Sequence, residues 1–518
     1  MSALKYSLRM VVVVALVTLF APAVRSQEIG ARNPDAMAAY EEGMKLLEAE
    51  NWDDAIAAFT TAIGIDNTFA EAFFGRGEAL RNLEDYQAAL DNYKQATNID
   101  PKSAKAYNGQ AICEKELGLI DLAFNDFNNA IELDRRDPEI AANLGELLVN
   151  RDPASALRVL DKAAELDPEN AEVFRNRGLA HAQLRQFDEA NADLAKAIEL
   201  KDDDFETYAM QANIFLFQDE KELIPKAIDA LTNAIKYYEP EESSDPKSYV
   251  QGYLLRSDAR LKMASDEDTP EDKREELYQQ VIDDADAVLS EMPDTFPSSG
   301  QALYRKGVAL RMQGLYGEAI KAFTDALQQI PPGESAPYIT NAYLKRGMCW
   351  FSQGENRLAR GDFLLAAASD YTDPLPHLWT GYTFAEEGDY RSAIESYGEA
   401  INKNPTFSLP YVNRGLAYVA LDEYQRAADN FNEAIRVEPT TSDHFAKRGY
   451  AYMLMEEYDK AFDSFNLSSL YDENNPEAFE AAAQTLRSLG RNALAEKYEQ
   501  RAQELKEKPA QQLQDKTN

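Results

Sequence analysis

Histidine and cysteine offer the most versatile chemistry of any side chains, and this chain has few of either. Its 518 residues include three histidines, His181, His377 and His444, and two cysteines, Cys113 and Cys349. A zinc site or a histidine relay needs its side chains within bonding distance of one another, and these histidines are widely separated in the sequence. We expect the histidines in a groove or on the surface, and the cysteines as buried packing residues without a disulfide.

Other catalytic signatures are also missing from the sequence. It contains no phosphate-binding glycine loop of the Walker type and no dinucleotide fingerprint. Acidic pairs such as Asp283 and Asp284 are frequent, but the chain has 90 acidic residues, so we expect such pairs on solvated faces. The sequence therefore predicts no catalytic residue, no metal site and no cofactor.

Most of the chain is instead taken up by a repeating pair of predicted helices, best seen between Ser408 and Thr441. Apolar residues at helical spacing run up to Leu421, a polar turn follows, and a second apolar face ends before Pro439. A glycine inside a helix costs about 1 kcal/mol relative to alanine. Gly415 therefore indicates a place where another backbone comes close, with Ala427 and Ala434 as the expected partners.

The same residue types recur every 34 positions. Small residues occupy the eighth and twentieth positions, an aromatic residue the twenty-fourth, alanine the twenty-seventh, and proline stands near the thirty-second. This pattern resembles the tetratricopeptide repeat (TPR). The resemblance implies an all-α fold, a right-handed α-solenoid of about 13 helix hairpins, in which each hairpin packs only on its neighbours.

The period divides the chain into regular and irregular regions. We predict a signal peptide at 1–26, a linker at 27–35, five regular repeats at 36–204, two irregular repeats with acidic loops at 205–299, six regular repeats at 300–506 with the last one capping, and a disordered tail at 507–518. The fourth repeat, at 138–170, is one residue short at its turn. In the irregular region Ala212 and Ala227 are 15 residues apart, where 12 is the rule.

The N-terminus has the features of an export signal. Lys5 and Arg9 precede an apolar run from Met10 to Phe20, and small residues follow. The only glycosylation pattern that proline does not block, at Asn466, lies in a predicted helix, which favours a bacterial exported protein. We expect a periplasmic or extracellular location without a membrane span after cleavage; the alternative is an uncleaved N-terminal membrane anchor.

The charge and the family resemblance indicate what the chain binds. A formal net charge of −37 disfavours nucleic acid, because phosphate contacts need a basic surface. The resemblance implies a non-catalytic scaffold or adaptor for other proteins. The alternatives are a structural component of an envelope assembly and, more remotely, an enzyme with an unrecognised active site.

The resemblance also predicts where a partner binds. Positions two, five, nine and twelve of each first helix line the concave groove in this family. In the N-terminal half these positions carry mainly charged residues, whereas in the C-terminal half they form an apolar stripe. The stripe, our candidate peptide-binding groove, consists of Leu344, Met348, Phe351, Leu378, Tyr382, Leu409, Val412, Leu416, Val419, Tyr450 and Met453. The carboxylate clamp of the chaperone-adaptor members is incomplete, because only Asn413 matches it.

The export hypothesis makes a direct prediction. When the full chain is expressed with its N-terminus in a bacterial host, the mature protein should begin after Ala23 or Ser26, where small residues follow the apolar run. Intact-mass measurement of the protein in the envelope fraction checks this. Recovery of the full-length mass from the membrane fraction would favour the uncleaved anchor.

Overall fold

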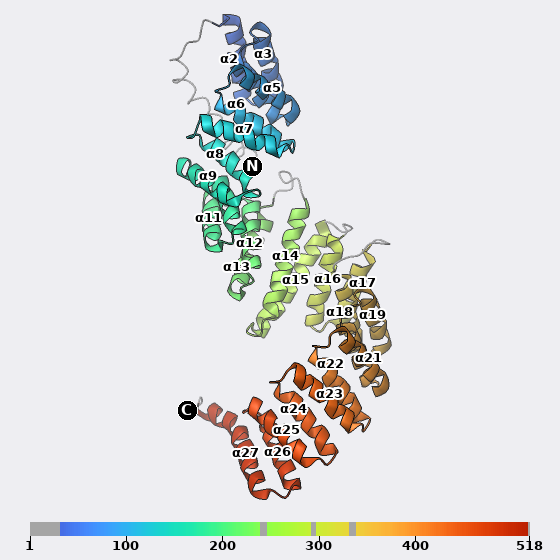
Figure 1. Cartoon of the computed structure of the whole chain (residues 1–518). Coiled ribbons are helices and arrows are strands. Elements are labelled where there is room, and N and C mark those ends of the chain that lie inside the picture. The colour runs from blue at the N-terminus through green and yellow to red at the C-terminus, as the bar shows by residue number, and fades with distance from the viewer. Residues whose placement is uncertain (1–31, 239–245, 292–296, 331–337, 516–518) are drawn as a thin grey trace. The chain divides into compact units, whose positions relative to one another are not determined.

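The computed structural model describes residues 32–238, 246–291, 297–330 and 338–515, and it forms two compact units that divide between Ser244 and Asp245. We call them the N-terminal unit and the C-terminal unit. The predicted signal at 1–26, most of the linker at 27–35 and most of the acidic loop at 239–247 lie outside the described residues. Within the described ranges every regular element is a helix, and 26 α-helices pair into 13 hairpins (Figure 1).

The N-terminal unit contains hairpins 1 to 6. Their helices are α2 (Pro34–Glu48) with α3 (Trp52–Ile65), α4 (Ala70–Asn82) with α5 (Tyr86–Ile99), α6 (Ala104–Glu116) with α7 (Ile120–Leu133), α8 (Pro138–Val149) with α9 (Pro153–Leu166), α10 (Ala171–Gln183) with α11 (Phe187–Leu200), and α12 (Phe205–Gln218) with α13 (Ile224–Lys236).

The C-terminal unit contains hairpins 7 to 13. Their helices are α14 (Pro246–Ala264) with α15 (Glu271–Glu291), α16 (Ser298–Met312) with α17 (Tyr316–Gln328), α18 (Ile339–Ser352) with α19 (Asn356–Ser369), α20 (Leu375–Glu386) with α21 (Tyr390–Lys403), α22 (Ser408–Ala420) with α23 (Tyr424–Val437), α24 (Ser442–Leu454) with α25 (Tyr458–Tyr471), and α26 (Pro476–Ser488) with α27 (Asn492–Asp515).

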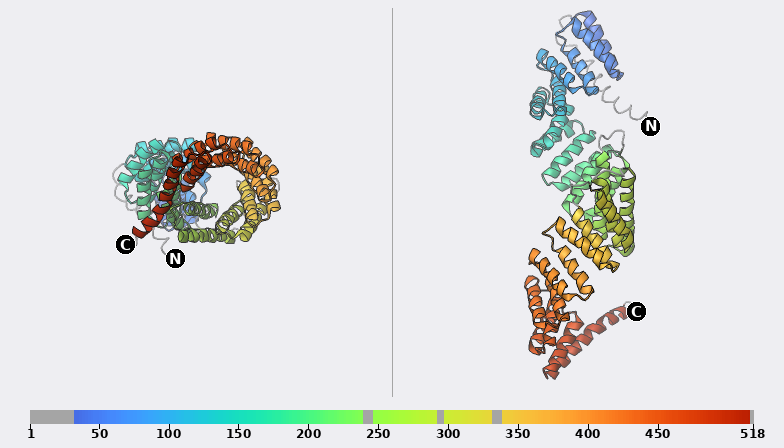
Figure 2. Two further views of the ribbon diagram at one scale, coloured as in Figure 1. Left: turned by 90° about the horizontal axis from the view of Figure 1, so that it is seen from below. Right: turned by 90° about the vertical axis from the view of Figure 1, so that its right-hand side faces the viewer.

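Within each unit the hairpins stack in sequence order, with each second helix against the first helix of the next hairpin. Figure 2 shows the hairpins of the C-terminal unit following one another along a curved path. The predicted all-α repeat solenoid is therefore confirmed. No helix in the described part of the chain is both long and apolar enough to cross a membrane.

A short turn with one left-handed residue joins the two helices of most hairpins. Asp422 has a φ of 59°, and its amide donates to the Val419 carbonyl at 3.0 Å. Glycine takes the equivalent place in other hairpins, for example Gly388 with a φ of 79°. This left-handed residue caps the carbonyls at the end of the first helix and reverses the chain.

Most regular hairpins close around a glycine that faces a large side chain from their own second helix. Hairpins 3 and 13 have Ala111 and Ala483 at this position. A Cβ atom added at Gly415 would lie 2.6 Å from Cε1 of Phe431, and the Phe431 ring is fully buried. Gly381 faces Tyr397 in the same way. The sequence predicted that another backbone comes close to Gly415, and this prediction is corrected. The group nearest to Gly415 is the Phe431 ring, which needs the space that a Cβ atom would occupy.

The irregular hairpins show where the extra residues go. In hairpin 6 the additional residues between α12 and α13 form the 3-10 helix η2 (Lys221–Leu223), which leads directly into α13. In hairpin 7 the predicted acidic loop at 265–276 is shorter than expected, because α15 already begins at Glu271. The Arg274 side chain holds this shortened loop in place by donating hydrogen bonds to the backbone carbonyls of Asp266 and Glu267.

The C-terminal end also differs from the prediction. We expected a disordered tail at 507–518, but α27 continues to Asp515. Alanine, glutamine and leucine after Pro509 are good helix formers, whereas Pro509 itself lacks a backbone donor and costs about 3 kcal/mol inside a helix.

The glycine contact predicts a difference between two alanine substitutions. Gly415→Ala should lower the unfolding free energy by about 1–3 kcal/mol, because its methyl group overpacks against Phe431. Gly361→Ala in α19 should be neutral or stabilising by up to about 1 kcal/mol, because no atom lies within 4 Å of its added Cβ. Urea denaturation followed by circular dichroism measures both. Equal effects of the two substitutions would contradict the packing role of Gly415.

Candidate functional site

The predicted apolar stripe is divided between the core and the surface. Leu344, Leu378 and Val412, at the fifth position of their helices, are buried, so the structure corrects their assignment as groove residues. They pack against the second helix of their own hairpin, as Leu378 does with Ala393 and Tyr397. Position five therefore belongs to the interior of the hairpin.

The other residues of the stripe keep accessible surface. Leu409, Leu416 and Tyr450 are 41%, 42% and 47% exposed. Leu409 and Leu416 are seven residues apart, so they lie on the same face of α22, and Tyr450 occupies in α24 the position that Leu416 occupies in α22. The remaining residues are partly buried: Met348, Phe351, Tyr382, Val419 and Met453.

Aromatic rings join the first helices of hairpins 9 and 10 along this surface. The Trp379 ring meets Phe351 edge-on at 5.8 Å and Tyr382 edge-on at 5.3 Å between centroids. Asn413 of the next hairpin donates from Nδ2 to the Tyr382 hydroxyl at 3.1 Å. These contacts hold Tyr382 in place, so it supports the surface and is less available to a partner than Leu416.

The equivalent positions in the N-terminal unit satisfy one another across hairpins. Lys115 of α6 forms an ion pair with Glu146 of α8 at 3.0 Å, and Asn108 donates to Glu139 at 3.4 Å. Arg175 of α10 pairs with Glu206 of α12, also at 3.0 Å. The charged side chains of this surface therefore largely neutralise one another. At the equivalent positions of the C-terminal unit, apolar side chains are exposed.

An arginine on the first helix of several hairpins connects three helices, and we call this arrangement the arginine bridge. In hairpin 5, Arg177 donates from Nε to Asp193 of α11 at 2.8 Å and from Nη1 to Asp161 of α9 at 3.0 Å. Its guanidinium also lies over the Phe174 ring, 5.2 Å from the centroid. One side chain therefore ties a first helix to its own second helix and to that of the preceding hairpin.

The arginine bridge recurs with constant spacing. In five hairpins the Nε atom of this arginine donates to a residue 16 positions later. In each of them the guanidinium also lies over an aromatic ring from the residue three positions earlier. The five arginines are Arg76, Arg177, Arg346, Arg414 and Arg448. Sequence reasoning missed these residues. The signal that would have found them is an arginine in the first helix followed after 16 residues by Asp, Asn or Ser.

The residues first considered for chemistry are mostly packing residues. Cys113 and Cys349 are fully buried free thiols, as predicted, and burial raises the pKa of Cys113 to about 12. His444 is buried, which corrects its expected groove or surface position, and burial lowers its pKa. His181 and His377 are partly buried, in other hairpins.

Asp284 is a second correction, because it is buried and not solvated. It accepts from Arg256 at 2.5 Å and from Arg260, both on α14, so it joins the two helices of hairpin 7. Its neighbour Asp283 is exposed, as expected. Among the described residues no cluster of histidine, cysteine or acidic side chains could hold a metal ion.

Glu114 of α6 has a strongly raised pKa. Its carboxylate is 1% exposed, and only Lys94 approaches it with opposite charge, at 3.8 Å. Burial and then the neighbouring Asp126 carboxylate raise the pKa of Glu114 to about 7. The folded protein therefore holds a proton here that the unfolded chain releases at lower pH.

Comparisons with known proteins agree with this architecture. Models described as tetratricopeptide repeat or TPR repeat match residues 40–104, 74–139, 144–213, 274–335, 381–422 and 412–471, which together make up more than half of the chain. The chain belongs to the tetratricopeptide repeat family. Members of this family are in general non-catalytic scaffolds for protein–protein interaction.

Among solved structures, MamA is 25% identical, with 32% of this chain and 96% of that chain covered and a TM-score of 0.30. YrrB, described as a TPR protein with an unusual peptide-binding site, is 25% identical, with coverages of 33% and 90% and a TM-score of 0.30. Yeast Tom70 is 15% identical, with coverages of 92% and 99% and a TM-score of 0.35. A comparison with curated protein sequences gave no match.

The titration of Glu114 predicts how stability changes with pH. The raised pKa stabilises the folded state fully below about pH 4.5, and this contribution disappears as the pH rises to about 7. Relative to Glu114→Gln, the wild-type melting temperature should therefore fall between about pH 4.5 and 7.5. Glu132→Gln, an exposed position on α7, is the control and should show no such trend. A constant difference between wild type and Glu114→Gln at all pH values would contradict the assignment.

Proposed function

We propose that this protein is a non-catalytic scaffold that binds an extended peptide or an amphipathic helix on the first-helix surface of its C-terminal unit. The exposed part of the apolar stripe, Leu409, Leu416 and Tyr450, carries the proposal. These side chains repeat along successive first helices, so they offer a row of apolar contacts to one elongated ligand.

Packing within the hairpins does not require large apolar side chains at these three exposed positions. Gly415 and Ala417, which flank Leu416, are buried against the second helix, so the hairpin core is complete without Leu416. Large apolar side chains that stay exposed on successive first helices are typical of binding surfaces. Burying such a side chain is worth roughly 1.5–3 kcal/mol, which is enough for a few of them to determine affinity.

A polar side chain beside the stripe, that of Asn413, gives a bound peptide a defined orientation. Asn413 lies between Leu409 and Leu416 on α22, and its amide nitrogen donates to the Leu409 carbonyl and to Tyr382. Its amide oxygen, with two lone pairs, can accept a hydrogen bond from a peptide N–H group. Apolar contacts on both sides of one polar anchor suit a peptide in a defined register.

The proposal includes export, and a periplasmic or extracellular partner. The support for this part is the sequence from Lys5 to Ser26, with its basic start and apolar run. The strongly acidic composition keeps a long chain soluble and favours protein partners with basic flanking residues.

The binding surface can be tested with selected peptides. Peptides are selected from a random displayed library on the purified wild-type chain, and their affinity is then measured by fluorescence anisotropy. Leu416→Glu with Tyr450→Glu should weaken binding by tenfold or more, because two charges replace apolar contacts at exposed positions. The melting temperature should fall only modestly, because the Tyr450 ring also packs edge-on against the buried Phe465 ring, with 4.9 Å between centroids.

The matched control carries the same two charges on another surface. Leu365→Glu with Tyr371→Glu changes residues that are 45% and 75% exposed and lie outside the stripe. This variant should bind like the wild type. Equal loss in both variants, or no loss in the Leu416 and Tyr450 variant, would contradict the proposed surface.

A further inference from the structure

Hairpin 4 lacks the arginine bridge that its neighbour has. Leu144 occupies the place that Arg177 holds in hairpin 5, and Val159 stands where the acceptor Asp193 stands. The aromatic ring beneath the guanidinium is also missing, because Ala141 replaces Phe174. Asn128 of α7 is nevertheless present 16 residues before Leu144, where an acceptor from the preceding hairpin belongs.

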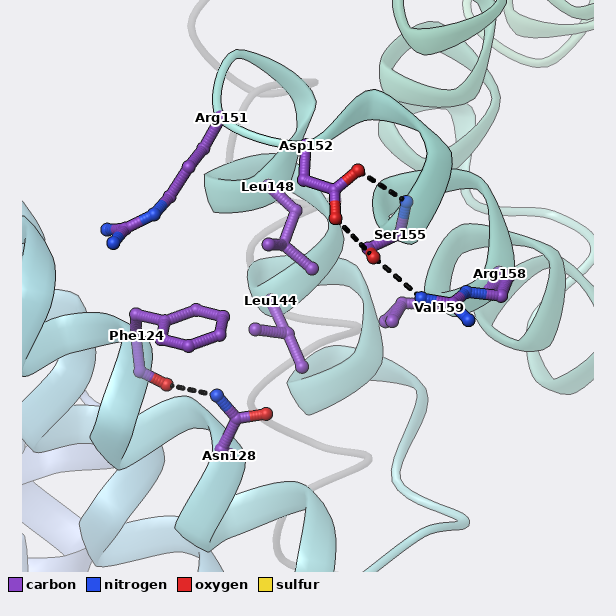
Figure 3. Close-up of a pocket in the computed structure, with 9 residues that line it drawn as sticks. All are labelled: Phe124, Asn128, Leu144, Leu148, Arg151, Asp152, Ser155, Arg158 and Val159. Atoms are coloured by element: carbon purple, nitrogen blue, oxygen red, sulfur yellow. Dashed lines mark hydrogen bonds between the residues drawn. The ribbon is translucent and has the colours of Figure 1, made fainter.

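A cavity of about 360 Å³ occupies this region, between α7, α8 and α9. Figure 3 shows its apolar floor, which Leu144 and Leu148 form together with Phe124. The full lining consists of Phe124, Asn128, Leu144, Leu148, Arg151, Asp152, Ser155, Arg158 and Val159.

Two arginines stand at the rim on opposite sides of the floor (Figure 3). Arg151 stacks over the Phe124 ring at 5.2 Å and pairs with Asp121 at 2.7 Å. Arg158 donates to the Ser155 hydroxyl at 2.6 Å and forms no ion pair with any described carboxylate. In a chain with a formal net charge of −37, a guanidinium without a carboxylate partner beside an apolar cavity favours an anion.

The one acidic group in the lining is already engaged. The Asp152 carboxylate accepts from the Ser155 amide at 3.2 Å and from the Ser155 hydroxyl at 2.5 Å, which caps the start of α9. These bonds, and to a smaller extent the charge of Arg158, hold the pKa of Asp152 below its usual range. Asp152 therefore caps the helix and interacts with Arg158 through the Ser155 hydroxyl, and the other N–H groups of the guanidinium are available to a ligand.

We propose that this cavity binds a small amphipathic monoanion, an aliphatic or aromatic group of about eight heavy atoms that carries a carboxylate. The apolar group would lie on Leu144, Leu148 and Val159, and the carboxylate would accept from Arg158. The volume lies at the lower end of the range of ligand pockets, about 300–1,000 Å³, which suits a ligand of this size. The site is separate from the apolar stripe, which belongs to the other unit.

Octanoate is the probe, and octylamine of the same chain length is the charge control. Isothermal titration of the full chain should show saturable octanoate binding at one site, with octylamine at least tenfold weaker. Arg158→Ala should weaken octanoate by at least fivefold. Arg135→Ala, an exposed arginine outside the cavity, should leave the affinity unchanged.

A second variant closes the cavity by building the missing bridge. Leu144→Arg with Val159→Asp places a guanidinium between the introduced carboxylate and Asn128, as in hairpin 5, and should abolish octanoate binding without lowering the melting temperature. If this variant does not fold, the surface variant Arg158→Ala still decides. Absence of saturable octanoate binding to the wild type, equal binding of octylamine, or unchanged affinity in Arg158→Ala would each overturn the proposal.

Discussion

The packing of one large side chain against one glycine organises most of the regular hairpins. The Phe431 ring sits where Gly415 has no side chain, and Ala427 and Ala434 on the same face of α23 let the helices lie close enough for this contact. A two-helix hairpin of this size cannot bury enough apolar area to be stable alone. Its remaining apolar face must be covered by the next hairpin, so the local glycine contact also leads to the array.

The arginine bridge solves a different problem, the coupling of one hairpin to the next. Apolar packing is non-directional, so it leaves the angle between adjacent hairpins poorly specified. The forked hydrogen bonds of Arg177 to Asp193 and Asp161 fix three helices at once, with a geometry that few other side chains could provide. In hairpin 4, where Leu144 stands in place of this arginine, a cavity lies between α7, α8 and α9.

The sequence was sufficient to predict the hairpins, because glycine, alanine and aromatic residues recur at one period and each has a local packing role. It was less informative for residues whose environment is set by a second helix. Leu378 has the same apolar character as Leu416, and only the position of Ala393 and Tyr397 shows that it is buried. Likewise, Asp284 is one of 90 acidic residues in sequence, and its two arginine partners become evident only when α14 and α15 are paired.

The spacing of the arginine bridge bears on how such an array changes in evolution. Arg448 reaches 16 residues back to Asn432 and 16 residues forward to Ser464. Because the arginine and its acceptors recur with the 34-residue period, duplicating or deleting a whole hairpin within a bridged stretch still places an arginine against a polar acceptor on each side. The number of hairpins can therefore change by whole units without disturbing the junctions between them. The length of the array can in this way evolve separately from its binding surface.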